Sequence, residues 1–357
     1  MAEYEIIELV VPVSHDAPDA ADFTEAVAIQ SFIETEGYGT DELWQSAADV
    51  LPFFKDPGNP RRLFGVRLGG KLVARAVFDW QSSDDTSAYA RVEVLPAYRR
   101  QGIGTALADH LESLVRAAGR SKVLCWAVAK VADGEQLASP TGFGSVPRAN
   151  PETVFLLSRG FTLEQVERAS RLALPLDADE LRERVDAAAL RSGPDYALHY
   201  WSVSTPERWL EQMAVLHTRM STDAPSAGLE QPEDVWTIDR VVENEANHAK
   251  AKFVITAAVE HVPTGTLAGY TTLAVPREPG RPVFQDDTLV LKDHRGHRLG
   301  MLLKVANLEN LQREYPGHPS VITWNAEENR FMLDVNEAVG FVPIGYEGAW
   351  KKLLDQP

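Results

Sequence analysis

The stretch VLPAYRRQGIGTAL, residues 94–107, decides how the rest of this 357-residue sequence is interpreted. An apolar run leads through a basic turn with two glycines into a segment of helical periodicity. Unpaired backbone N–H groups converge at a helix N-terminus, and the helix dipole adds partial positive charge there. Gly102 and Gly104 let the main chain approach an anion closely, and Arg99 and Arg100 add charge. The stretch therefore predicts a binding site for a diphosphate-bearing ligand.

Other phosphate-binding motifs fit this stretch less well. The run GIGTAL, residues 102–107, lacks the third glycine of the dinucleotide-binding fingerprint. No Lys-Ser or Lys-Thr pair follows the glycines, as the nucleotide-binding P-loop requires. The remaining alternative is a glycine-containing helix cap that binds no ligand.

A second copy of the stretch, VLKDHRGHRLGMLL, lies at residues 290–303. Arg295 follows Arg99 by 196 residues (295 − 99), enough for one domain. Apolar runs bounded by Gly and Pro predict strands around each copy. These strands are 63–68, 72–79, 89–95 and 122–128 in the first half, and 252–260, 266–273, 288–291 and 321–324 in the second. A short predicted helix then ends in Gly-Phe in both halves, at 160–161 and 340–341. The matching context argues against a ligand-free cap.

The two halves also begin alike, with a β run followed by two helical segments. These segments are 4–13, 22–37 and 41–54 in the first half, and 196–203, 206–220 and 232–248 in the second. Thr205 and Pro206 are predicted to cap and to begin a helix. The sequence thus predicts a mixed α/β fold with a first domain at 1–176, a connecting helix at 177–193 and a second domain at 194–357.

On these residues the chain resembles the GNAT N-acetyltransferase superfamily, as a tandem protein similar to the two-domain class that includes mycothiol synthase. The superfamily signature, Arg/Gln-x-x-Gly-x-Gly/Ala, is matched by Arg99, Gly102 and Gly104. The resemblance implies that each domain has a central mixed β-sheet flanked by helices and that the loop binds the pyrophosphate of acetyl-CoA. It also implies that the strand before the loop diverges from the next strand, with pantetheine in the gap near the backbone of Val94.

The second copy departs from the signature at one position. Arg295 and Gly300 match it, whereas Arg298 takes the place of the first glycine. An L-residue there is expected to hold a helical conformation, which would keep the backbone cradle intact and let the arginine reach a phosphate. After the next strand, Asn325 and Asn329 are expected either to hold pantetheine or to cap the following helix, and the sequence leaves both roles open.

The resemblance thus places acetyl-CoA contacts in both copies. In the first copy they are Val94, Arg99, Arg100, Gln101, Gly102, Ile103, Gly104 and Thr105. In the second they are Val290, Arg295, Gly296, His297, Arg298, Leu299, Gly300 and Met301, with Asn325 and Asn329. No metal site is predicted, because His294 and His297 have no Cys or further His near them in the sequence.

Acyl transfer to an amine requires a neutral amine, an oriented thioester and stabilisation of the developing oxyanion. A carboxylate is a common base for the first requirement. Glu93 in the first copy and Asp286 or Asp287 in the second lie on or beside the strand before the motif. Asp287 is the favoured base, although each of the three is equally well interpreted as a solvated strand carboxylate.

Many GNAT enzymes place a Tyr four residues before the glycine of the Gly-Phe pair, where it acts as the general acid. Leu156 and Asn336 take that position here. Leu156 cannot donate a hydrogen bond, whereas Asn336 can donate one to sulfur but cannot protonate it. Chemistry is therefore expected in the second domain.

The composition limits the partners and the compartment. A net charge of −17, from 35 Lys and Arg against 52 Asp and Glu, disfavours nucleic acid and attracts protonated amines. The single cysteine, Cys125, permits no intramolecular disulfide and lies in a predicted buried strand. No signal-type N-terminus and no apolar run near the ~18 residues of a membrane span are present. We expect a cytoplasmic monomer or homodimer without a membrane partner.

The sequence therefore predicts an acyltransferase that moves the acetyl group of acetyl-CoA to a primary amine of a small molecule. One alternative is a non-catalytic acyl-CoA-binding or sensing protein, because the Tyr is missing from both halves. Others are an acyltransferase that uses another acyl-CoA or a hydroxyl acceptor, and a nucleotide-binding module that uses the same turn.

Overall fold

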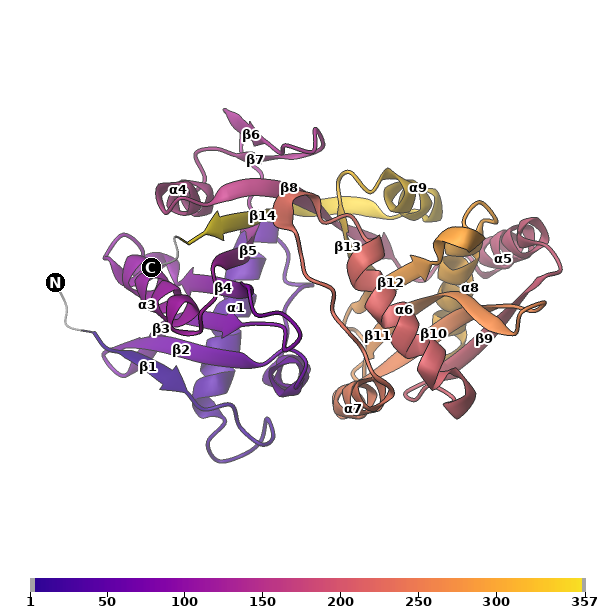
Figure 1. The fold of residues 1–357 in the computed structure, drawn as a ribbon, viewed down its shortest axis with the longest axis horizontal. Coiled ribbons are helices and arrows are strands. Elements are labelled where there is room, and N and C mark those ends of the chain that lie inside the picture. The colour runs from indigo at the N-terminus through magenta and orange to yellow at the C-terminus, as the bar shows by residue number, and fades with distance from the viewer. Residues whose placement is uncertain (1–3, 355–357) are drawn as a thin grey trace. The chain divides into compact units, whose positions relative to one another are not determined.

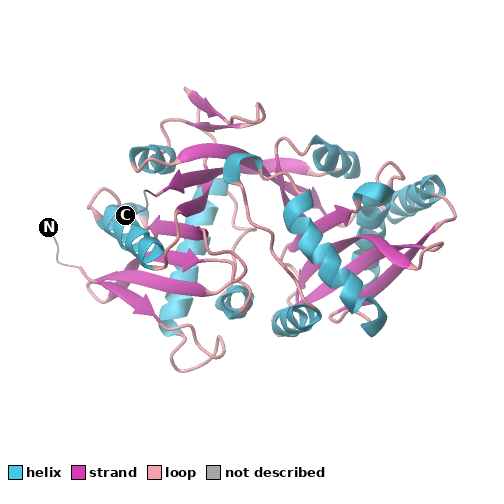
Figure 2. Ribbon diagram, viewed as in Figure 1, coloured by secondary structure: helices cyan, strands magenta, loops and turns pink. Residues whose placement is uncertain are grey.

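The computed structural model of the protein describes residues 4–354, which divide into two compact units. Unit 1 comprises 4–167, Ser226–Pro232 and 345–354, and unit 2 comprises Arg168–Pro225 and Glu233–Ile344. Figures 1 and 2 show the elements of each unit. The domains expected from the sequence, 1–176 and 194–357, remain a prediction. The structure adds that two later segments of the chain lie with unit 1.

Unit 1 contains a mixed sheet with the strand order β1-β2-β3-β4-β5-β14. The strands are β1 (Ile6–Leu9), β2 (Arg61–Leu68), β3 (Lys71–Asp79), β4 (Ser87–Val94), β5 (Lys122–Ala129) and β14 (Val342–Leu353). Neighbours are antiparallel except β4 and β5, which are parallel. Residues Tyr346–Leu353 of β14 pair with β5, so the end of the chain completes the sheet of the first unit.

Helices cover both faces of this sheet. They are α1 (Ala21–Tyr38), α2 (Ala47–Val50), η1 (Leu51–Lys55), η2 (Pro96–Tyr98), α3 (Ile103–Ala117) and α4 (Pro151–Ser158). Alternating side chains of β2 belong to two hydrophobic cores, one on each face of the sheet, because successive residues of a strand point to opposite faces. Leu63 packs with Phe23 of α1, whereas Phe64 packs with Leu107 of α3. Figure 1 shows α1 and α3 on opposite sides of the strands.

The segment Ser226–Pro232 is part of unit 1, where one buried apolar side chain and two hydrogen bonds hold it. Leu229, in η4 (Ala227–Leu229), is fully buried against Leu124 and Ala349. The ammonium groups of Lys122 and Lys351 donate to backbone carbonyls of the segment. A small hairpin of β6 (Gln136–Ala138) and β7 (Ser145–Pro147) also lies in this unit.

Unit 2 repeats the arrangement with the strand order β13-β12-β11-β10-β9. The strands are β9 (Tyr196–Ser202), β10 (Lys252–His261), β11 (Thr266–Pro276), β12 (Val283–Val290) and β13 (Ser320–Ala326). The helices are α5 (Ala178–Ser192), η3 (Glu207–Trp209), α6 (Leu210–Asp223), α7 (Ile238–His248), η5 (Lys292–His294), α8 (Leu299–Glu314) and α9 (Arg330–Val339). β12 and β13 are parallel, whereas the pairs β9–β10, β10–β11 and β11–β12 are antiparallel. Helices α5 and α8 pack on one face and α6 on the other.

Most predicted elements are confirmed, and several local predictions are wrong, among them the predicted β run at 4–13, of which only Ile6–Leu9 is a strand. The predicted connecting helix is α5, whose N-cap Asp177 accepts a hydrogen bond from the Glu180 amide at 2.9 Å. Thr205 caps no helix, because its hydroxyl donates to Glu245 at 2.6 Å. The predicted helices at 41–54 and 232–248 begin only at Ala47 and Ile238, and the predicted strand at 288–291 begins at Val283.

Two long strands were absent from the prediction. They are β8 (Thr162–Ala173), which begins in unit 1 and ends in unit 2, and β14, which does the reverse. The β8 sequence TLEQVERASRLA is rich in helix formers, so tertiary packing overrides its local preference. None of the helices in residues 4–354 is both long enough and apolar enough to cross a membrane.

Candidate functional site

Each unit contains one pair of parallel strands that diverge. In unit 1, β4 and β5 pair only from Ser87 with Lys122 to Tyr89 with Leu124. In unit 2, β12 and β13 pair only at Val283 with Val321 and Phe284 with Ile322. Beyond these pairs both strands continue, so their backbone groups border a gap. The divergence implied by the family resemblance is confirmed in both units.

The loop after β4 leads into an uncapped helix. Gly102 is the N-cap of α3 and has a left-handed backbone (φ 89°), with no side-chain hydrogen bond to cap the helix. A Cβ added at Gly102 would meet only the hydroxyl of Tyr4, at 3.7 Å. The first N–H groups of a helix have no acceptor within it. This open, positively polarised cradle fits a diphosphate group.

The equivalent loop of unit 2 follows the same backbone path without the glycine. Arg298 is the N-cap of α8 and is also left-handed (φ 59°), so the predicted helical conformation of Arg298 is wrong. A left-handed L-residue costs about 1–2 kcal/mol because its Cβ crowds the following carbonyl. Gly296, two residues earlier, has φ 90°, whereas its counterpart in unit 1 is Arg100, a left-handed L-residue with φ 63°. The loop thus keeps the shape of a diphosphate cradle with strain at Arg298.

The two signature arginines make the same contacts. Each Nε donates to the carbonyl of the last residue of the preceding strand, and each guanidinium pairs with a helix carboxylate. The pairs are Arg99 with Val94 (3.0 Å) and Glu36 (2.6 Å), and Arg295 with Val290 (3.1 Å) and Asp223 (3.1 Å). Their charges are therefore already paired. The exposed side chains of Arg100 and Arg298 are better placed to meet an anion.

In unit 1 the candidate base Glu93 forms a buried ion pair. Its carboxylate lies 2.5 Å from Nε of Arg75, and the two side chains are only 8% and 3% exposed. Glu34 of α1, which the sequence analysis did not single out, faces Arg91 at 3.8 Å. Burial raises the pKa of Glu34 to about 7, against the opposing charge of Arg91. The Glu93 carboxylate is thus held in a buried ion pair with Arg75.

In unit 2 the carboxylates lie at a β-bulge. Thr271 pairs with Thr288 and Leu273 with Gln285, so Asp286 and Asp287 together oppose the single residue between Thr271 and Leu273. Bulges redirect side chains and are frequent beside active sites. β4 pairs with β3 in unbroken register, so the unit 1 sheet has no such irregularity on this strand.

The two aspartates of the bulge differ in environment. Asp286 is exposed to solvent, yet enough protein surrounds it that desolvation raises its pKa to about 6. The charge of Lys252 opposes this shift and that of Asp287 adds to it. Asp287 accepts a hydrogen bond from the Tyr270 hydroxyl at 2.9 Å. A solvent-accessible carboxylate pair therefore lies at the position where the sequence predicted a base.

Two further residues join Asp287, and the sequence analysis missed both. The Tyr270 hydroxyl lies 3.1 Å from Nδ1 of His217, which in turn lies 3.8 Å from the Asp287 carboxylate. His217 lies on α6 and Tyr270 on β11, 53 residues apart in the chain. No local pattern signals a contact over this separation.

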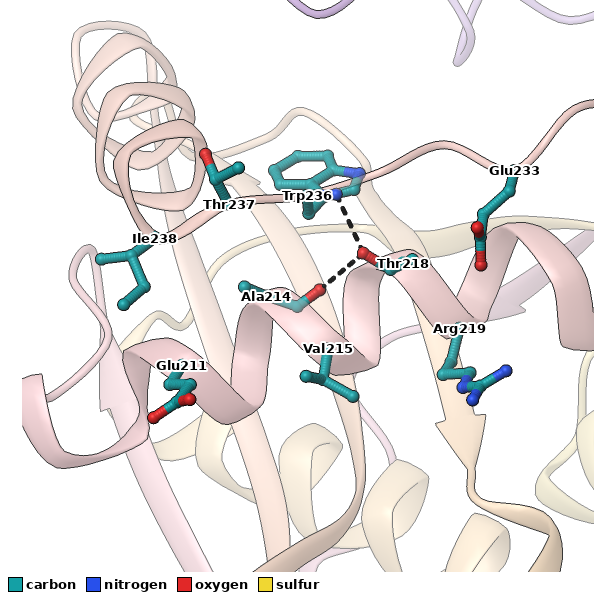
Figure 3. A pocket seen from close by; sticks show the side chains of 9 residues that line it. All are labelled: Glu211, Ala214, Val215, Thr218, Arg219, Glu233, Trp236, Thr237 and Ile238. Carbon is teal, nitrogen blue, oxygen red and sulfur yellow. Dashed lines mark hydrogen bonds between the residues drawn. The ribbon is translucent and has the colours of Figure 1, made fainter. Parts of the chain in front are cut away.

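A groove of about 370 Å³ runs beside α6, and Figure 3 shows it from close by. Its lining residues are Glu211, Ala214, Val215, Thr218, Arg219, Glu233, Trp236, Thr237 and Ile238. The amide of Trp236 donates to the Thr218 hydroxyl at 2.9 Å and holds the segment against the helix (Figure 3). No residue predicted to bind acetyl-CoA lines this groove.

The three predicted asparagines of unit 2 have different roles. Asn329 is the N-cap of α9 and accepts from the Met332 amide at 3.3 Å, which supports the capping alternative. Asn336 is 1% exposed and donates through Nδ2 to Oδ1 of Asn325 at 2.6 Å. The Oδ1 atom of Asn336 is buried and has no hydrogen-bond donor among the described residues. An unpaired acceptor fits a ligand amide, such as those of pantetheine.

Other candidate chemistries find no support in residues 4–354. This part of the chain contains no group of three or more His, Cys, Asp or Glu side chains arranged to hold a metal ion. His294, beside the second loop, contacts the Tyr196 hydroxyl at 3.0 Å through Nδ1. Burial raises the pKa of the Cys125 thiol to about 12, which disfavours a nucleophilic thiolate.

Comparisons with known proteins agree with this geometry. Residues 24–136 match the model of the Acetyltransferase (GNAT) family. The mycothiol acetyltransferase of Salinispora arenicola (strain CNS-205) is 29% identical over 292 residues, which cover 80% of each chain.

Solved structures extend the likeness to the whole chain. A tandem GNAT protein from the clavulanic acid biosynthesis pathway, solved without acetyl-CoA, covers 98% of both chains with a TM-score of 0.71 and 22% identity. A GCN5-related N-acetyltransferase from Sphaerobacter thermophilus covers 98% of this chain and 95% of its own, with a TM-score of 0.60 and 12% identity. These likenesses show the fold of both units.

Proposed function

The chain has the tandem GNAT fold with an acetyltransferase-family match in its first half, and from this premise we propose that it is an N-acetyltransferase. The proposed reaction moves the acetyl group of acetyl-CoA to a primary amine of a small molecule, and unit 2 carries it out. The observation that carries the proposal is the carboxylate pair Asp286 and Asp287 at the β12 bulge, beside the gap between β12 and β13.

The proposed coenzyme sites are the two uncapped helix starts. The backbone N–H groups after Gly102 and after Arg298 would hold the diphosphate, with Arg100 and Arg298 adding charge. In unit 2 the unpaired Oδ1 of Asn336 would accept from the pantetheine arm. When bound, the coenzyme supplies an acetyl group activated as a thioester.

The aspartates of the bulge have two tasks in this proposal. An alkyl ammonium of pKa near ~10 is charged at neutral pH and must lose a proton before it can attack. Two adjacent carboxylates attract the cation, and Asp287 takes up its proton. Asp286, with its pKa of about 6, is ionised at neutral pH and strengthens the attraction. Backbone N–H groups of β12 that border the gap are available to stabilise the oxyanion.

Unit 1 is proposed to bind the coenzyme without catalysis. Its carboxylate Glu93 is held by Arg75, and Leu156 lies in the core at the position where many GNAT enzymes have the Tyr acid. A non-catalytic acyl-CoA sensor is therefore the second candidate for the whole chain. The absence of a protonating side chain at Asn336 favours it.

Release of free CoA from acetyl-CoA, measured with the full chain and a panel of primary amines, separates the two candidates. The panel should include the acceptor of the mycothiol acetyltransferase relative. We expect turnover that Asp287→Asn lowers at least about a hundredfold. The control is Asp85→Asn, which changes an exposed carboxylate before β4 and should leave turnover unchanged. Coenzyme binding without turnover across the panel would establish the sensor.

A further inference from the structure

Lys304 is a lysine in the interior of unit 2 without a charged partner among residues 4–354. It lies on α8, is 2% exposed, and has its ammonium nitrogen 5.7 Å from the centroid of the Phe341 ring. Within the described part of the chain it forms no salt bridge and no hydrogen bond. A buried ammonium group without such a partner is destabilising. Stability therefore does not explain a lysine at this position.

Burial alone lowers the pKa of Lys304, to about 7. The elements packed against α8 carry titratable groups, yet none of their charges contributes to this shift. Several of these groups pair with one another: Glu180 with Arg184, Arg182 with Glu309, Glu260 with His199, Glu337 with Arg168, and Asp334 with Arg330. Others are Asp286 and Asp287 on β12, Lys252 and His261 on β10, and the exposed Asp179, Glu183, Asp186 and Arg191 on α5.

Lys304 lies next to residues that border the gap between β12 and β13. The backbone amide of Phe341 donates to the carbonyl of Asn336 at 3.0 Å. The Asn336 side chain in turn donates to Asn325 of β13, beyond the point where β12 and β13 stop pairing. The amine is thus close to the β13 border of the gap.

The β12 border is reached through the same face of α8. Asn307, three residues after Lys304 and therefore on the same face, donates through Nδ2 to the carbonyls of Ile255 and Thr271 at 3.2 and 3.5 Å. Thr271 pairs with Thr288 at the edge of the bulge. This face of the helix therefore lies on the sheet at the level of the proposed base.

Lys304 and the proposed base Asp287 approach the gap from opposite faces of the sheet. Helix α8 packs on one face, whereas Tyr270, which donates to Asp287 at 2.9 Å, packs with α6 on the other. Acyl transfer uses a base beside the attacking amine and an acid beside the leaving group. Unit 2 has one titratable group on each side of the gap.

We propose that Lys304 is the general acid that protonates the sulfur of coenzyme A as the acetyl group leaves it, an inference that rests on the proposed function. Asp287 first takes a proton from the acceptor ammonium, and the free amine forms a C–N bond to the acetyl carbon. The C–S bond then breaks, its electron pair stays on sulfur, and Lys304 gives sulfur a proton. The acylated nitrogen and Asp287 each release one proton to water. Lys304 takes one back from the water that replaces the departed sulfur, so each turnover releases one proton.

This assignment supplies the acid that the Tyr position lacks, since Asn336 cannot protonate sulfur. A thiol has a pKa near ~8.5, so an ammonium group with a pKa of about 7 gives its proton to a thiolate favourably. Unit 1 has Ala108 at the position equivalent to Lys304 (304 − 196 = 108) and Leu156 at the Tyr position. It lacks both donors, in agreement with coenzyme binding without catalysis there.

Kinetics and stability of the full chain separate a catalytic from a structural lysine. Lys304→Met should lower kcat about a hundredfold with little change in the KM for acetyl-CoA. Its free energy of unfolding should not fall, because an apolar side chain replaces an unpaired buried amine. Lys304→Arg should be equally slow, since a guanidinium group does not release its proton. The control is Lys250→Met, which removes an exposed lysine bonded to Asn247 at 2.9 Å and should keep the wild-type rate.

The pH profile should identify the acid. Only the ammonium form of Lys304 donates, so the wild-type kcat should fall as the pH rises through the pKa of about 7. Lys304→Met should have a lower kcat without this basic limb, whereas Lys250→Met should keep it. An identical basic limb in Lys304→Met would assign the limb to another group and overturn the inference.

A measurement without turnover checks the amine itself. Carbon-13 NMR of the lysine ε-carbons in the ligand-free protein should show one signal that titrates near pH 7 and is absent from Lys304→Met. The Lys250 signal should titrate near ~10.4. A Lys304 midpoint near that ordinary value, wild-type turnover by Lys304→Met, or a raised KM with unchanged kcat would overturn the general acid and leave the acetyltransferase proposal standing. Failure of the wild-type protein to acetylate any amine would instead overturn the proposed function, and this inference with it.

Discussion

The two units share one loop geometry and hold different parts of the proposed acyl-transfer site. Unit 1 keeps the signature glycine, because Gly102 holds the left-handed backbone at the helix start without strain, and the left-handed L-residue of its loop is Arg100 (φ 63°). Unit 2 holds the same conformation with Arg298, at a cost of about 1–2 kcal/mol. Unit 2 has the proposed base, because its bulge presents Asp286 and Asp287, whereas Glu93 of unit 1 is held by a buried arginine.

The position of a residue relative to the motif therefore does not fix its role. Glu93 and Asp287 both lie on the strand before the loop, each in the unit's diverging pair of strands. Glu93 is a member of a buried ion pair, whereas Asp287 is partly exposed and accepts a hydrogen bond from Tyr270. A structural role for Glu93 and a catalytic role for Asp287 predict different effects of substitution.

The largest effect is expected at Asp287. Asp287→Asn removes the proposed base and keeps the hydrogen bond from Tyr270 available, so kcat/KM should fall about 10²- to 10⁴-fold. The free energy of unfolding should change little. Steady-state kinetics and thermal unfolding of the same preparation measure both. Full activity in this variant would show that unit 2 does not use Asp287.

Glu93→Gln should lower the stability of the protein and leave its catalytic rate unchanged. It leaves the Arg75 guanidinium buried without its carboxylate, so the free energy of unfolding should fall by about 3 kcal/mol while kcat per folded molecule is kept. Replacing both residues with apolar ones, as in Arg75→Met with Glu93→Leu, should recover most of that loss. Denaturant titration measures these stabilities. A catalytic defect in Glu93→Gln without loss of stability would show that Glu93 takes part in the reaction and is not only a structural ion-pair partner.

The pH dependence should report on Asp286. Its pKa is raised to about 6, so the carboxylate is charged above that pH and becomes neutral as the pH falls through it. The attraction for an ammonium weakens accordingly, and kcat/KM should fall up to about tenfold per pH unit below pH 6. Asp286→Asn should flatten this limb of the profile. An identical acid limb in the variant would assign it to another group.

The smallest effect is expected at the second loop. Arg298→Gly relieves the left-handed strain, and after the entropic cost of glycine the unit should gain up to about 1 kcal/mol of stability. Gly102→Ala should lose a similar amount, because it adds a Cβ at φ 89°. Thermal unfolding of both variants tests the pair. Equal and opposite changes would confirm that the two loops share one backbone path.

The repeated loop was predictable because its information is local. Glycines, arginines and the flanking strands lie within a few tens of residues and recur 196 residues later (295 − 99), so the repeat and its anion-binding geometry can be deduced from the sequence. The left-handed backbone at Arg298 was not predictable, since the residue type favours the helical conformation and the path of the loop imposes the other.

The remaining features depend on contacts between distant residues. Tyr346–Leu353 completes a sheet whose partner strand ends at Ala129, and Leu229 fills a core more than a hundred residues earlier in the chain. The bulge at Asp286 is a property of strand register, and the contact between His217 and Tyr270 joins a helix to a strand. Hydrophobic periodicity contains none of this information.

Calorimetric titration of coenzyme A into the full chain tests whether the loops bind a diphosphate, which the proposed chemistry requires. We predict saturable binding that weakens when Gly102→Glu places a carboxylate and a strained Cβ in the cradle of unit 1. Gly300→Glu should weaken the contribution of unit 2 in the same way. No detectable heat at millimolar coenzyme A would contradict the account.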